Sequence, residues 1–145
     1  MSFFRTIQVS ASALTAERMR MDVIASNLAN ANTTRTADGS PYRRRVVLFA
    51  PLVNQMTASV EGAVAGGGPG GVVVTGIAED PTPPRRVYQP GHPDADAQGY
   101  VMLPAINPVT EMVDLMASSR AYEANVTALN VAKQLVLKAL EIGRR

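Results

Sequence analysis

The feature that most constrains the fold is a long apolar segment near the end of the chain, at residues 109–142. Asn107 is a suitable helix cap and Pro108 suits the first helical position, so the pattern predicts one helix that starts here. Thirty-four residues of α-helix span about 51 Å, whereas a compact globule of 145 residues has a diameter of roughly 38 Å. The helix must therefore extend beyond any compact domain that this chain forms.

Apolar residues lie on every face of this expected helix. Alanine or a larger apolar residue occupies 20 of its 34 positions. One column repeats every seven residues, namely Leu115, Tyr122, Leu129 and Val136. A helix that is apolar nearly all round is buried nearly all round, and soluble monomers avoid large exposed apolar patches. We therefore expect other subunits to cover the faces that this chain cannot cover itself.

A second helix is predicted at the start of the chain, from residue 3 to about residue 31. Its apolar column has the same spacing of seven and comprises Ile7, Leu14, Met21 and Leu28. This is a narrow, coiled-coil-like seam. Ser10 and Glu17 occupy other positions of the stripe, so the seam is weak in isolation. We expect the two helices to pair antiparallel, with both termini at one end and the segment between them at the other.

Glycine and proline become frequent between residues 32 and 107, and the helical periodicity disappears. Short β-rich runs at 46–49 and 72–74, with a weaker one at 100–103, predict strands. The Gly-rich run 62–71 predicts a mobile loop, and 80–84 an extended connector. The fold class is mainly α with a small, irregular β-rich insert, in which long N- and C-terminal helices form a coiled-coil-like core. The expected division is 1–31, 32–107 and 108–145.

Composition narrows the possible chemistry. The chain has no cysteine, which excludes disulfides and thiolate sites, and its net charge of +2 does not by itself indicate nucleic acid binding. We expect no membrane-spanning segment and no cleaved signal peptide. The only acid–base cluster is His92, Asp94 and Asp96, which Gly91 and Pro93 mark as a turn. We interpret it as a hydrogen-bonded turn and expect no catalytic residue, cofactor or metal site.

Three consecutive arginines, Arg43, Arg44 and Arg45, form the one dense positive patch. In a strand, Arg44 would face away from the other two, so the three cannot form one flat surface for phosphate. A solvated face or a salt-bridged subunit contact is one interpretation. The alternative function is a soluble adaptor or a nucleic-acid-binding protein that uses this patch.

Polar residues within the two expected helices need an explanation. Asn30 can end the first helix, but Asn27 lies inside the seam and suits hydrogen bonding across a helix boundary. The second helix carries a polar cluster among apolar neighbours, made up of Arg120, Tyr122, Glu123 and Asn125. Arg120 and Glu123 either pair on the surface or fix the register between buried helices. We predict that both clusters and both apolar columns serve subunit packing.

These clusters lie in motifs that closely resemble the flagellar basal-body rod protein family. The terminal motifs are Ser12-Ala-Leu-Thr-Ala16, Asn27-Leu-Ala-Asn-Ala-Asn-Thr33, Glu111-Met-Val113 and Ser119-Arg-Ala-Tyr-Glu-Ala-Asn-Val126. The middle of the chain is similar to the proximal-rod members, in the runs Asp80-Pro-Thr-Pro-Pro-Arg85 and Tyr88-Gln-Pro-Gly-His-Pro-Asp-Ala-Asp96. The resemblance covers nearly the whole chain.

The resemblance implies a structural subunit of the proximal rod, an axial helical assembly that transmits torque to hook and filament. It implies that the terminal helices form the inner core of a tube and order largely on assembly. The implied partners are other rod proteins, copies of this chain and the flagellar type III export apparatus, without nucleic acid. The implied location is the periplasmic rod of the basal body, reached without a cleaved signal peptide.

Overall fold

The computed structural model describes residues 3–52 and 70–143. The chain begins with one long helix, α1 (Phe3–Ala29), and ends with another, α2 (Pro108–Gly143), and four strands lie between them in the sequence. The strands are β1 (Arg45–Pro51), β2 (Val72–Glu79), β3 (Arg85–Tyr88) and β4 (Tyr100–Leu103). The predicted fold class is confirmed: the molecule is mainly α, with a small insert of two separate antiparallel hairpins.

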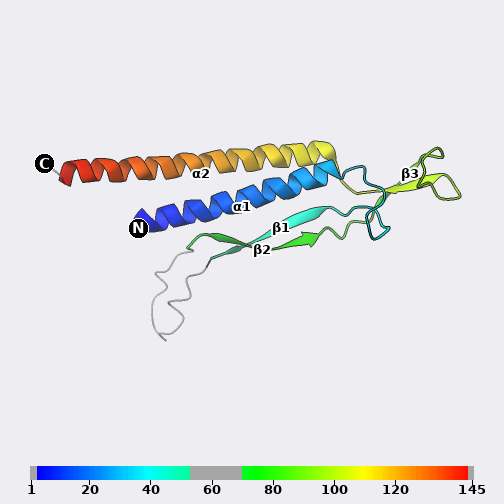
Figure 1. Ribbon diagram of the computed structural model, residues 1–145, viewed down its shortest axis with the longest axis horizontal. Coiled ribbons are helices and arrows are strands. Elements are labelled where there is room, and N and C mark those ends of the chain that lie inside the picture. Colours follow the sequence, from blue (N-terminus) through cyan, green and yellow to red (C-terminus); the bar gives the residue numbers. More distant parts are fainter. Residues whose placement is uncertain (1–2, 53–69, 144–145) are drawn as a thin grey trace, which may run out of the picture.

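The two helices lie side by side and antiparallel, with both ends of the chain at the same end of the molecule (Figure 1). The start of α2 follows its sequence signals, because the Asn107 side chain accepts a hydrogen bond from the Val109 amide at 3.0 Å. The end of α1 is fixed by Asn30, whose side-chain amide donates to the Ser26 carbonyl at 2.9 Å. At about 1.5 Å per residue, the 36 residues of α2 extend well past the 27 of α1.

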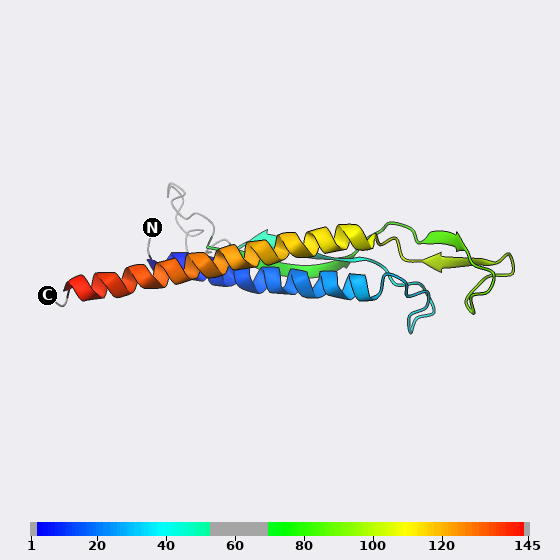
Figure 2. The ribbon, with the colours of Figure 1, turned by 90° about the horizontal axis from the view of Figure 1, so that it is seen from above.

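The first hairpin corrects the expected place of the insert. β1 and β2 pair antiparallel, with a bulge between Leu48 and Phe49, and they run back along α1 on the side away from α2. Helix α1 therefore lies between α2 and this hairpin (Figure 1), and α2 continues past the start of α1 (Figure 2). Only the second hairpin, β3–β4, projects beyond the far end of the helix pair. The hairpin's position gives α1 a second partner within the same chain.

β4 has the bounds that the sequence predicted, β1 and β2 are longer than predicted, and β3 was not predicted at all. Four residues that include two arginines carry no strand signal by themselves, so pairing with β4 is what makes Arg85–Tyr88 extended. Of the Gly-rich run expected to be a mobile loop, residues 62–69 lie outside the described part of the chain. Gly70 and Gly71, at its end, lie where the strands of the first hairpin meet its loop, and both are hydrogen-bonded to Leu52.

The core of the described chain is small. It lies mainly along the seam between the helices and between α1 and the first hairpin, where its apolar members are Ala16, Val23, Ile24, Val47 and Ala132. A second cluster, comprising Ala31, Tyr42 and Ile106, closes the end of the helix pair. Much of α2 remains in solvent, and its exposed large apolar residues are Val109, Met112, Val113, Met116, Val131, Leu135, Leu137, Leu140 and Ile142.

Candidate assembly core and its polar junction

Asn27 is the centre of a buried polar junction at one end of the helix pair. Only 1% of its surface is exposed. Its side-chain nitrogen donates to the Arg45 carbonyl at 2.8 Å and to Glu111 Oε2 at 3.1 Å. Its side-chain oxygen accepts from the Tyr42 hydroxyl at 3.1 Å and from the Arg45 amide at 2.9 Å. All four hydrogen-bonding positions of the amide are therefore filled, as burial requires.

Glu111 brings a carboxylate into this junction from the first turn of α2. It is also 1% exposed, and its Oε1 accepts from Arg44 Nε at 2.7 Å. The same guanidinium lies 3.7 Å from Asp80 Oδ2 and 3.6 Å from Asp114 Oδ2. A carboxylate this deeply buried needs a paired and hydrogen-bonded cation, and Arg44 supplies both.

The junction joins segments that are far apart in the sequence. Asn27 belongs to α1, Tyr42 and Arg44 to the segment before β1, Asp80 to the segment after β2, and Glu111 to α2. Because each contact is made by a buried or half-buried side chain, the junction holds the two helices and the first hairpin together at one end. It also changes the interpretation of the arginine patch, since Arg44 faces three carboxylates inside the fold.

The predicted apolar columns are not the most buried positions of the helix pair, since the buried residues of α2 are Glu111, Ser118 and Ala132. The Ser118 hydroxyl donates to Glu17 Oε2 at 2.5 Å, and Asn27 bonds Glu111, so these four residues lie where α1 and α2 meet. Every member of both columns is half-buried; they are Ile7, Leu14, Met21, Leu28, Leu115, Tyr122, Leu129 and Val136. The part these residues play between subunits stays a prediction.

The other predicted packing residues are divided between seam and surface. Asn30 is half-buried and accepts from the Thr33 hydroxyl at 3.1 Å, which closes the turn after α1. Asn125 is half-buried and donates to the Ala121 carbonyl one turn back. Arg120 and Glu123 are both exposed on α2, and no ion pair joins them within the described residues. Their predicted role in register would therefore need a second chain.

The His92–Asp96 segment is built as a turn. His92 Nδ1 accepts from the Asp94 amide at 3.1 Å, and Asp96 Oδ1 accepts from the Tyr100 amide at 2.9 Å. Hydrogen bonds from that amide and from Arg86 and the Gln98 amide, together with the charge of Arg86, hold the pKa of Asp96 below its ordinary value. The described residues contain no cluster of three or more His, Asp or Glu side chains that would hold a metal ion.

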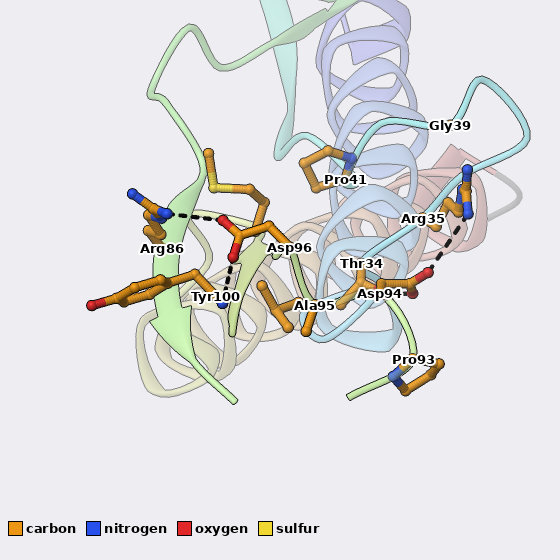
Figure 3. A pocket seen from close by; sticks show the side chains of 12 residues that line it. Thr34, Arg35, Gly39, Pro41, Arg86, Pro93, Asp94, Ala95, Asp96 and Tyr100 are labelled. Carbon is orange, nitrogen blue, oxygen red and sulfur yellow. Dashed lines mark hydrogen bonds and ion pairs between the residues drawn. The ribbon is translucent and has the colours of Figure 1, made fainter. Parts of the chain in front are cut away.

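A shallow pocket of about 540 Å³ separates this turn from the segment that follows α1 (Figure 3). Asp94 crosses it, accepting from the Thr34 hydroxyl at 2.7 Å and lying 3.7 Å from Arg35. On the other side, Arg86 lies over the Tyr100 ring at 4.1 Å and pairs with Asp96 at 2.8 Å. Because each charged group in the lining already has a partner of opposite charge, the arrangement suits holding the second hairpin in place.

Sequence reasoning missed the partners that complete the junction. Tyr42 and Arg44 stand in a segment without periodicity, and Glu111 is indistinguishable from an ordinary acidic residue in the first turn of a helix. The one available signal was Asn27, whose place inside an apolar seam indicated a hydrogen-bonding partner elsewhere. Neither α1 nor α2 is apolar enough over a sufficient length to cross a membrane.

Comparison with known proteins agrees with this architecture. Residues 7–35 match the family described as "Flagella basal body rod protein", and residues 97–142 match "Flagellar basal body rod FlgEFG protein C-terminal". The chain is 47% identical to the flagellar basal-body rod protein FlgC of Bacillus subtilis, over 99% of this chain and all of the relative. It is 44% identical to FlgC of Borreliella burgdorferi, over 98% of each chain.

A third relative, FlgC of Escherichia coli O6:H1, is 43% identical over 99% of this chain and all of its own length. The two family matches cover most of α1 and α2, and the second also includes β4. The similarity to the relatives also includes the two hairpins between the helices, so it covers nearly the whole chain. The chain belongs to the flagellar basal-body rod protein family and is a FlgC-like member of it.

Proposed function

We propose that this chain is a load-transmitting subunit of the flagellar rod and acts through packing without catalysis. That it is a structural rod subunit follows from its family. The observation that supports the finer proposal is the state of α2, which leaves apolar residues such as Val109, Leu135 and Ile142 more than 60% exposed in a single chain. Burying such side chains stabilises an assembly by about 25 cal/mol per Å². An assembly of several chains would cover them.

The partners we propose are copies of this chain and other rod proteins, because a helix exposed on several faces needs more than one neighbour. We also propose passage through the flagellar type III export apparatus without a cleaved signal peptide, and a place in the periplasmic part of the basal body. These proposals rest on the names of the relatives, which are basal-body rod proteins.

The alternative of a nucleic-acid-binding adaptor gains no support. Arg44 is engaged with Glu111, Asp80 and Asp114 within the fold, which separates it from the exposed Arg43 and Arg45. A phosphate-binding surface would need these guanidinium groups to face solvent together.

The decisive experiment is complementation of a motile bacterium that lacks its own FlgC. Expression of this chain should restore swimming in soft agar, and cryo-electron microscopy of purified basal bodies should place its helices in the rod. Swimming cells whose rods contain no density for this chain would contradict the proposal. A chain that stays monomeric and binds nucleic acid with a steep dependence on salt would support the alternative instead.

A further inference from the structure

The first hairpin is fastened to α1 at both of its ends. At one end, the Asn27 side chain binds the backbone of Arg45 twice, accepting from its amide at 2.9 Å and donating to its carbonyl at 2.8 Å. An amide side chain used in this way replaces the neighbouring strand that the edge of β1 would otherwise need. The contact is buried, since Asn27 is 1% exposed.

At the other end, Ser12 plays the corresponding part. Its hydroxyl accepts a hydrogen bond from the Val72 amide at 3.1 Å and donates to the Val9 carbonyl at 2.7 Å. The backbone passes so close to the helix that a Cβ on Gly71 would overlap the Ser12 hydroxyl. Gly71 also has φ +137°, a conformation that residues with a Cβ rarely adopt. Glycine is therefore required for this contact.

The spacing of the two contacts matches the length of the hairpin. Fifteen residues of α-helix between Ser12 and Asn27 span about 22 Å. On the strand side, Arg45 is bound by Asn27, and Val72 pairs with Pro51, six residues further along β1. Six residues of strand span about 20 Å. The helix and the strand can therefore hold both contacts at once without bending.

From this match we propose that Ser12 and Asn27 form a two-point clamp, by which α1 and the β1–β2 hairpin gain and lose order as one unit. A two-stranded hairpin is marginal in water by itself, and so is an isolated helix whose apolar seam is narrow. With two fixed points, neither element can separate from the other without breaking a partly buried hydrogen bond. The inference concerns folding within one chain and goes beyond the role of the chain in the rod.

Hydrogen exchange measured by mass spectrometry on the full-length chain tests the clamp. Peptides from α1 and from the hairpin are followed through a urea titration or, where the free chain shows no protection, through a trimethylamine N-oxide titration that favours compact states. In the wild type, both sets of peptides should gain protection at the same midpoint. In Ser12→Ala, exchange in the hairpin should rise about fivefold relative to α1, the effect of one lost hydrogen bond.

Gly71→Ala tests the same contact by changing the hairpin in place of the helix. Like Ser12→Ala, it should make the hairpin lose protection before α1 does. The matched control is Thr15→Ala, which removes a hydroxyl that donates to the Ala11 carbonyl of its own helix. That control should leave the ratio between α1 and hairpin exchange unchanged. Separate midpoints in the wild type would overturn the proposal, as would coincident midpoints in both Ser12→Ala and Gly71→Ala.

Discussion

Removing the carboxylate of Glu111 should destabilise the fold far more than removing its more exposed neighbour Asp114. In Glu111→Ala, Arg44 loses its 2.7 Å partner inside the junction and Asn27 loses one acceptor. Breaking a buried pair by deleting one member costs about 3–5 kcal/mol. Arg44 retains Asp80 and Asp114 at 3.7 and 3.6 Å, and a quarter of its side chain is in solvent. We therefore expect the lower end of the range, about 3 kcal/mol.

Two further variants separate charge from shape. Glu111→Gln keeps the volume and one acceptor, but its NH2 group would then face a donor of either Arg44 or Asn27. One unsatisfied buried group costs about 1–3 kcal/mol, so the glutamine variant should lie between wild type and alanine. Asp114→Ala is the matched control: its side chain is 38% exposed and its pair with Arg44 is longer. An exposed pair of this kind contributes about 1 kcal/mol or less.

The assay is urea unfolding of the full-length chain at pH 7, followed by circular dichroism. With a slope of about 1.5 kcal/mol per M, the Glu111→Ala midpoint should fall by about 2 M, while the Asp114→Ala midpoint moves by less than about 0.7 M. The slope itself should not change. Equal shifts for the two alanine variants, or no shift for Glu111→Ala, would refute the assignment of Glu111 as the buried centre of charge at this junction.

Other expected outcomes follow from the seam, from the extended connector and from the turn. Leu129→Asp places a carboxylate in the helix seam and should abolish swimming in complemented cells, whereas Asn130→Asp, on the exposed side of the same turn, should preserve it. Hydrogen bonds from Thr82, then the charge of Arg44, hold the pKa of Asp80 below its ordinary value of 3.8. Its contribution to stability is therefore present above that value and lost as the pH falls through the lower folded pKa; carboxyl NMR titration should show this midpoint, and Thr82→Val should raise it. Asp94→Ala should speed amide exchange in the His92–Asp96 turn. Metal content, measured by elemental analysis, should not change.

The junction has a consequence for how a rod subunit could carry load. A force on α2 reaches α1 through Glu111 and Asn27, and reaches the hairpin through Arg44 and the Arg45 backbone. Because all of these contacts are short and largely shielded from water, they resist separation better than exposed ion pairs do. Among the residues that the structure describes, the overhanging end of α2 makes no such contact, and we propose that neighbouring subunits stabilise it.

The amino-acid sequence by itself determined the two helices. Periodicity over 27 and 36 residues is a strong local signal, and the cap at Asn107 lies within two residues of the amide that it binds. The same signal identified the apolar columns and the exposed faces of α2, because a helix of this length cannot be covered by one partner. Asn27 could be singled out for the same reason, as a polar residue within an apolar period.

The arrangement of the helices and hairpins in space could not be predicted from local sequence patterns. The first hairpin packs along α1 because Asn27 and Ser12 bind its backbone, and backbone groups carry no sequence signature. Strand β3 forms because β4 pairs with it, and residues 85–88 by themselves do not predict a strand. Arg44 belongs to a buried junction because Glu111, 67 positions away, comes to 2.7 Å of it. Contacts between distant segments depend on the geometry of the whole chain, and local sequence patterns do not predict that geometry.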